Sequence, residues 1–160
     1  MTRAVILLAL ISLGACDAKK GEPNGIGQWR FGHTTPKVAS KYGLCDKTDT
    51  SAGRKVTWCH QMPPLKIANR NTTVDLYFEG HGDEGSLIEI QLVVIGCVED
   101  DLDRWIRSAL GPPKETRATR SYWQNSFMWV AALMPAEPGR CRLHFLPPSE
   151  TAEIERLKAK

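Results

Sequence analysis

This sequence of 160 residues has few long apolar runs and few recognisable site motifs. The apolar run at residues 4–11 is too short to span a membrane, because a spanning helix needs about 20 apolar residues. There is no C-x2-C or H-x3-H pair, which structural zinc sites usually contain. There is also no C-x-x-C-H motif for haem attachment. We therefore expect no bound metal and no cofactor.

Catalytic and nucleic-acid-binding patterns are missing as well. Neither the nucleophile elbow G-x-S-x-G nor the motif S-x-x-K occurs. The turn at residues 80–86 lacks the regular ligand spacing of a calcium loop and the Gly-Lys pair of a phosphate loop. The formal net charge is only +3 and no basic cluster accompanies it, whereas nucleic-acid-binding domains usually carry a clustered basic face. We expect that the protein is not an enzyme and binds no nucleic acid.

The N-terminus has the order of a secretory signal. A short positive start ending at Arg3 precedes the apolar run, and small residues follow it. The residues Leu13, Gly14, Ala15 and Cys16 resemble the bacterial lipobox. This resemblance implies cleavage before Cys16, a diacylglyceryl group on its sulfur, and an acyl chain such as palmitate on the new N-terminus. Two or more acyl chains anchor a protein stably to a bilayer.

The domain organisation follows from this signal. We expect a signal peptide at residues 1–15, a lipidated cysteine and flexible tether at residues 16–27, and a single domain at residues 28–160. The mature protein would then sit in the cell envelope, held by a lipid and facing the periplasm. Asp17 resembles the signal that keeps enterobacterial lipoproteins in the inner membrane. The choice between inner and outer membrane stays open and leans towards the inner one.

The four remaining cysteines indicate disulfides, because an even number is typical of exported domains. Three pairings are possible, and we favour Cys45–Cys59 and Cys97–Cys141. The first pair closes a polar stretch that looks like a loop, which is worth about 3 kcal/mol in the chain-entropy model. The competing interpretation is a metal site, built from Cys59 and His60 with Cys45, His33, His81 or His144. We instead interpret each histidine as a solvated surface residue.

Several elements can be read from hydrophobic periodicity. Thr35 and Pro36 predict the start of a short helix that Gly43 ends, with Val38, Ala39 and Tyr42 on one face. Alternation in residues 74–79 and 87–95 predicts a hairpin, with Val74, Leu76 and Phe78 towards the core and Ile88, Ile90, Leu92 and Val94 on one face. Residues 122–133 and 141–146 predict further strands, and Ser149 begins a terminal helix.

The best helix begins at Asp100 or Asp101 and stops before Gly111. Its apolar stripe consists of Leu102, Trp105, Ile106 and Ala109. We expect Trp105 to be buried against Ile88, Ile90 or Leu92. The acidic cluster at residues 99–103 is interpreted as the first turn of this helix, where acids interact well with the macrodipole, rather than as a catalytic group.

The layout resembles a broad group of small exported bacterial proteins with the pattern FGMT…YGPP, which are related to outer-membrane-assembly lipoproteins. The resemblance rests on Phe31-Gly32-x-Thr34, on the hairpin, and on the helix that ends in Leu110-Gly111-Pro112-Pro113. His33 and Lys37 depart from the pattern. The resemblance implies an α+β fold: one antiparallel sheet of about four strands, with two or three short helices packed on it and disulfides as staples.

For function, we expect a non-catalytic protein-binding or assembly module. Its partners would be the lipid bilayer, through acylated Cys16, and an envelope protein of unknown identity. Trp123, Phe127, Met128 and Trp129 are candidates for partner contact, because aromatic residues and methionine are enriched in interface cores. One alternative is a periplasmic hydrolase inhibitor that inserts the loop 46–55 or the turn 80–86 into its target. An enzyme using His81, Asp83 and Glu84 is a less favoured alternative.

Overall fold

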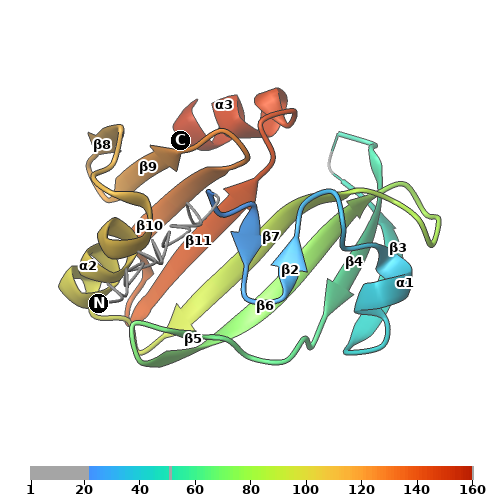
Figure 1. Cartoon of the computed structure of the whole chain (residues 1–160), viewed down its shortest axis with the longest axis horizontal. Helices are drawn as coiled ribbons and strands as arrows, with labels where there is room; N and C mark the ends of the chain where they lie inside the picture. The colour runs from blue at the N-terminus through green and yellow to red at the C-terminus, as the bar shows by residue number, and fades with distance from the viewer. Residues whose placement is uncertain (1–21, 51, 160) are drawn as a thin grey trace, which may run out of the picture.

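A computed structural model describes residues 22–50 and 52–159, and these ranges form eleven strands and three helices (Figure 1). Nine strands build one antiparallel sheet in the order β3-β4-β6-β7-β11-β10-β9-β8, with β5 paired to β6, while β1 and β2 form a separate two-stranded sheet. The elements are β1 (Gly25–Ile26), β2 (Trp29–Arg30), α1 (Pro36–Ala39), β3 (Leu44–Asp49), β4 (Lys55–His60), β5 (Lys66–Ile67), β6 (Arg70–Glu79), β7 (Leu87–Ile95), α2 (Glu99–Leu110), β8 (Glu115–Arg117), β9 (Arg120–Gln124), β10 (Trp129–Glu137), β11 (Arg140–Leu146) and α3 (Thr151–Ala159).

The expected α+β fold with about four strands is therefore wrong, because the protein is mostly β. The polar stretch 46–55, which we expected to be a loop, is a loop only in part, because residues 46–49 belong to β3 and Lys55 begins β4. The expected single strand at residues 122–133 is two strands, β9 and β10, which pair as a hairpin. Strand β3 buries almost none of its side chains, so its sequence shows no apolar alternation. Hydrophobic periodicity therefore cannot predict it.

One face of the sheet carries the main hydrophobic core. Successive side chains of a strand point to opposite faces, and Leu76, Ile90 and Phe145 come into register on the buried face. Val74 and Phe78 lie on the same face and are buried as predicted. The predicted hairpin of β6 and β7 is thus confirmed.

Helix α2 packs on this core face, and the periodicity that predicted it is confirmed. Leu102 and Ile106 are buried in the main core, and acidic residues occupy the first turn. Trp105 is only partly buried, and it borders a surface pocket rather than filling the core. The stripe is wider than the area that the sheet covers, so the expected full burial of Trp105 is wrong.

Helix α3 covers the opposite face, but only over strands β9, β10 and β11. There Ile154 and Leu157 pack against Tyr122, Ala131 and Leu146 in a second apolar cluster. The Tyr122 hydroxyl donates a hydrogen bond to the Leu157 carbonyl oxygen at 3.0 Å. Strands β9 to β11 are consequently covered on both faces.

Within the described ranges, none of the three helices is long and apolar enough to cross a membrane.

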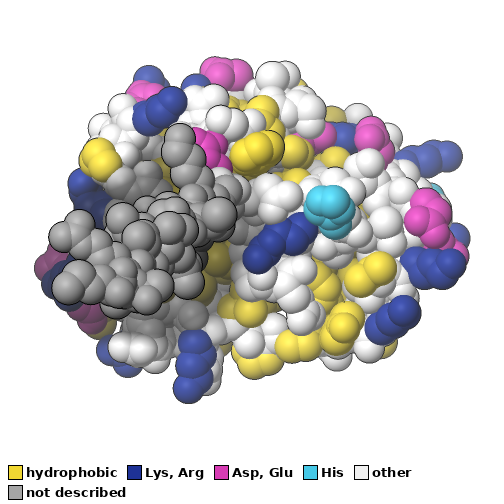
Figure 2. Space-filling view, in the orientation of Figure 1, with side chains coloured by type: hydrophobic (Ala, Val, Ile, Leu, Met, Phe, Trp, Pro, Cys, Tyr) yellow, Lys and Arg dark blue, Asp and Glu magenta, His cyan; other side chains and the backbone are white. Residues whose placement is uncertain are grey.

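The short helix α1 begins as predicted but buries less than expected. The Thr35 hydroxyl accepts a hydrogen bond from the Val38 backbone amide, which is the predicted N-cap. Ala39 is buried, whereas Val38 and Tyr42 are exposed. Figure 2 shows hydrophobic side chains at the surface in the part of the molecule that carries α1, with Lys, Arg and acidic side chains interspersed around the rim.

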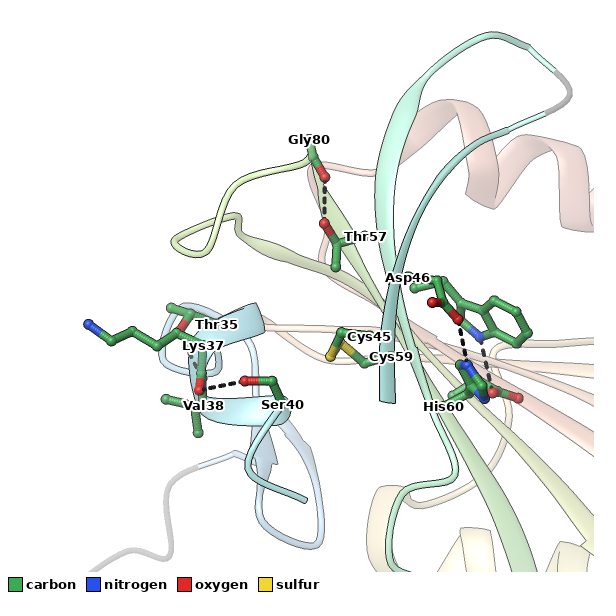
Figure 3. Close-up of a disulfide and its surroundings, with 12 residues drawn as sticks. Thr35, Lys37, Val38, Ser40, Cys45, Asp46, Thr57, Cys59, His60 and Gly80 are labelled. Atoms are coloured by element: carbon green, nitrogen blue, oxygen red, sulfur yellow. Dashed lines mark hydrogen bonds and ion pairs between the residues drawn. A yellow bond between two sulfur atoms is a disulfide. The ribbon is translucent and has the colours of Figure 1, made fainter. Parts of the chain in front are cut away.

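Both favoured disulfides are present. Cys45 bonds to Cys59 and Cys97 bonds to Cys141. Cys45 and Cys59 are direct neighbours in the register of β3 and β4, so this bridge fastens the edge strand of the sheet to the next strand. In Figure 3 the bridge lies on the side of these strands that faces α1, whereas Asp46 and His60 lie on the other side.

The described chain makes defined contacts from its first residues. The Glu22 carboxylate accepts a hydrogen bond from the Ser126 backbone amide at 2.9 Å. The Asn125 side-chain amide donates to the Pro23 carbonyl oxygen at 2.8 Å. Glu22 and Pro23, which we assigned to the tether, thus contact the turn between β9 and β10. The predicted signal peptide, the lipobox-like residues and Cys16 lie outside the described residues.

Candidate functional site

The aromatic residues that we expected at a partner surface are mostly buried. Trp123 and Met128 belong to the main core, with 1% and 2% of their surfaces exposed. Trp129 packs beside α3, where the Lys158 ammonium lies 4.3 Å from the centre of its ring. Only Phe127, at 51%, is open to solvent. These four side chains do not form one surface, because Trp123 and Met128 lie in the main core, Trp129 lies in the cluster under α3, and Phe127 is exposed in the turn between β9 and β10.

The turn at residues 80–86 is fastened to the rest of the fold. The Lys37 backbone amide donates to the Asp83 carbonyl oxygen at 3.0 Å, and the Lys37 ammonium lies 3.9 Å from the Glu84 carboxylate. The His81 ring interacts with Asp49, 3.3 Å away. These contacts hold the turn against α1 and β3.

His81 is thus engaged with β3 and not with the acids of its own turn. Within residues 22–50 and 52–159, no three His, Cys, Asp or Glu side chains are arranged to hold a metal ion.

The sheet instead presents a polar and aromatic surface on the face opposite the core. The register aligns Trp58, Tyr77 and Glu89 across β4, β6 and β7, and it places His144 beside Gln91. Helix α3 covers only the β9–β11 end of this face. We call the remaining surface the open sheet face, and it consists of Asp46, Trp58, His60, Asp75, Tyr77, Glu89, Gln91, Arg142 and His144.

Three aromatic rings form the first part of the open sheet face. The Trp58 and His60 rings are stacked, with centroids 4.3 Å apart, and the Tyr77 ring lies nearly parallel to Trp58 at 6.5 Å. All three side chains are partly exposed. The Trp58 indole N–H donates to the Asp75 carboxylate at 3.1 Å, and the His60 ring contacts Asp46 at 2.8 Å. The rings are therefore fixed by polar neighbours while part of their surface stays available.

A buried, hydrogen-bonded pair forms the second part. The His144 Nδ1 lies 2.6 Å from a Glu89 carboxylate oxygen, and the Gln91 side-chain amide donates to the same oxygen at 3.1 Å. The side chains of His144 and Glu89 are only 6% and 12% exposed. The expectation that each histidine is a solvated surface residue is therefore wrong for His144. Buried charged groups need such partners, because leaving one unpaired is costly.

Burial perturbs two titratable groups of the open sheet face. Burial raises the pKa of Asp75, although the hydrogen bond from Trp58 opposes that effect. Burial also raises the pKa of Tyr77 to about 12, and the nearby Asp75 and Glu89 carboxylates add to the shift. A group held in an unfavourable electrostatic environment on an accessible surface is a candidate for a functional role.

Ion pairs fix the borders of the open sheet face. The Arg54 guanidinium binds both carboxylate oxygens of Glu150, at 2.6 and 3.1 Å, and also reaches Glu79. These hydrogen bonds, first of all those that Arg54 donates to Glu150, raise the pKa of Arg54. On α3, the hydrogen bonds that Arg156 donates to Glu153 raise the pKa of Arg156, and the charge of Glu89 adds to the effect. The end of the β3–β4 hairpin and helix α3 thus flank the same face.

The open sheet face offers partly exposed rings, hydrogen-bonding groups and acidic charge on a disulfide-fastened sheet. In the sequence, this face is indicated by the polar residues of β6 and β7 that alternate with apolar ones.

The partners of these polar residues on β4 and β11 are set only by the sheet register. Neither a protein-family model, nor a curated protein, nor a solved structure matches this chain.

Proposed function

We propose that this protein is a non-catalytic binding module of the bacterial cell envelope, anchored through acylated Cys16, which binds an envelope protein through the open sheet face. The lipobox-like residues 13–16 support the anchor. The two disulfides support an exported domain, because such bonds persist in oxidising compartments. Asp17 favours retention at the inner membrane.

The observation that carries the proposal is the pair of partly exposed rings, Trp58 and Tyr77, on a sheet face that α3 leaves open. Tryptophan and tyrosine are enriched among the residues that contribute most to protein interfaces. Their neighbours Asp75 and Gln91 supply polar groups that set orientation. The opposite face of the central strands is buried in the main core, so a partner would have to bind the face that stays open.

The test is a pull-down of the tagged mature protein from crosslinked envelopes, comparing the wild type with the Trp58→Ala, Tyr77→Ala double variant. We expect the variant to lose an envelope partner that the wild type captures, while its urea midpoint shows that it still folds. The matched control is Phe127→Ala, because Phe127 is an exposed aromatic residue outside the open sheet face. The control should keep the partner.

Two outcomes contradict the proposal. If the double variant and the control capture the same partner equally well, the open sheet face is not the binding surface. If mass spectrometry finds the N-terminus of the mature wild type without lipid, the anchor is wrong. The two readouts are independent, so each half of the proposal is tested separately.

A further inference from the structure

A second surface feature lies on the other side of the sheet, beside α2. An apolar pocket is lined there only by non-polar residues, among them Ile26, Trp105, Ala109, Leu110, Met128 and Phe145. We call it the α2 groove. Trp105 belongs to the apolar stripe of α2 but is left partly exposed at this opening. The groove therefore presents apolar surface that the fold itself does not bury.

The N-terminal segment is fixed at the edge of this groove. Pro23 is itself a lining residue, and the Asn125 side chain holds its carbonyl oxygen. Glu22 is held one residue earlier by the Ser126 backbone amide. The chain that leads back to Cys16 therefore starts from the rim of the α2 groove and not from a distant part of the surface.

The distance that this segment can span is short. Six residue steps separate Glu22 from Cys16, and an extended chain covers at most about 3.6 Å per residue, or roughly 20 Å in total. The point at which a group is attached to Cys16 therefore stays within that radius of Glu22. A short covalent link of this kind gives the tethered group a high effective concentration at a nearby site.

We propose that the α2 groove binds an acyl chain carried by Cys16 of the same molecule. This inference rests on the lipid anchor of the proposed function. The groove and the acyl chain are both apolar, and removing apolar surface from water is favourable. One chain held in the groove would leave the remaining chains to bind the bilayer. The domain would then be held with α2 near its own anchor.

The test uses a fatty acid with a photoreactive diazirine, fed to cells that produce the full chain, so that the label becomes the acyl group of Cys16. After irradiation of intact envelopes, the mature protein is digested and its crosslinked peptides are identified by mass spectrometry. We expect crosslinks from the Cys16 peptide to peptides that contain Trp105 or Met128. A substitution that fills the groove, Ala109→Trp, should abolish most of this intramolecular product.

The matched control is Arg104→Trp, which adds the same side chain to α2 at an exposed position outside the groove lining. It should keep the intramolecular crosslink. Ala109 is also exposed, so neither substitution is expected to prevent folding, and both variants are checked by their urea midpoints. The wild-type crosslink map stands as a test even if one variant fails to fold.

The outcomes separate this inference from the anchor on which it rests. A labelled Cys16 peptide that crosslinks only to phospholipids or other proteins overturns the groove and leaves the anchor intact. Retention of the intramolecular product by Ala109→Trp also overturns the groove. A mature chain that carries no label on Cys16 overturns the anchor, and the groove proposal falls with it.

Discussion

The buried pair of Glu89 and His144 permits a quantitative test of the open sheet face. The change His144→Leu removes the partner 2.6 Å from the carboxylate and leaves Gln91, at 3.1 Å, as a remaining donor. Hydrogen bonds to charged groups contribute about 1.5–3 kcal/mol, and removal of one partner exposes the other to the full desolvation penalty. We therefore expect the free energy of unfolding to fall by about 1.5–3 kcal/mol, a large share of the roughly 5–15 kcal/mol that holds a domain together.

The double variant Glu89→Leu, His144→Leu provides the diagnostic comparison. When both members of a buried pair become apolar, no charge is left unpaired, and such replacements are often neutral or stabilising. The loss should thus be smaller than the sum of the two single losses, with a coupling energy of about 1–3 kcal/mol. Urea denaturation at neutral pH of the chain from residue 17 onward, with its disulfides intact, measures all four stabilities.

A control pair on α2 sets the scale for an exposed interaction. Arg107 and Asp103 form an ion pair four residues apart, with side chains 45% and 32% exposed. Their coupling in the same cycle should be about 0.5 kcal/mol or less. A coupling for Glu89 and His144 no larger than that of the control pair would refute the buried interaction. So would a His144→Leu variant as stable as the wild type.

Three further predictions concern the same sheet. Asp75→Asn should raise the urea midpoint at neutral pH, because the raised pKa of Asp75 shows that the fold disfavours its ionised carboxylate. The gain should vanish as the pH falls below 3.8, the ordinary pKa of aspartate. Tyr77 should titrate near pH 12 by ultraviolet absorbance. Its contribution to stability, complete below pH 10, should be lost as the pH rises through about 12, and Tyr77→Phe should abolish both effects. Removal of the Cys97–Cys141 bridge, which joins positions 44 residues apart, should lower the free energy of unfolding by about 4 kcal/mol. Removal of the Cys45–Cys59 bridge, which joins positions 14 residues apart, should lower it by about 3 kcal/mol, and denaturation of the two Cys→Ser variants compares the losses.

The features that could be predicted are those with a simple hydrophobic period. Strand β6 buries alternate residues, and β7 does so from Ile90 onward, so their hairpin can be predicted from the sequence. Helix α2 buries Leu102 and Ile106 on one stripe and is equally clear. The disulfides followed from the even number of cysteines and from their positions at the ends of apolar segments.

The missed strands lack such a period for two opposite reasons. In β3 almost every side chain is exposed, so nothing in its composition separates it from a loop. In β9 the neighbours Tyr122 and Trp123 are both buried, because α3 covers one face of the strand and the main core the other. A strand buried on both faces has a nearly continuous apolar sequence. For that reason the turn between β9 and β10 was not recognised in the sequence.

The open sheet face could be predicted only in part. The alternation of β6 and β7 shows that Asp75, Tyr77 and Glu89 point away from the core. It does not show that His144, 55 residues after Glu89, completes the pair, because that contact depends on β11 inserting next to β7. Long-range strand order is a property of the whole fold and leaves no local trace in the sequence.

The two edges of the nine-stranded sheet have a consequence for self-association. Strand β8 has only three residues, and β3 carries Asp46, Lys47 and Asp49, which are features that discourage pairing between sheet edges. In a twofold antiparallel pairing centred on Asp46 or on Lys47, the same charge would oppose itself across the new ladder, which is destabilising. Copies crowded on a membrane would therefore be hindered from joining edge to edge into a continuous ribbon, and each would keep its own sheet face free.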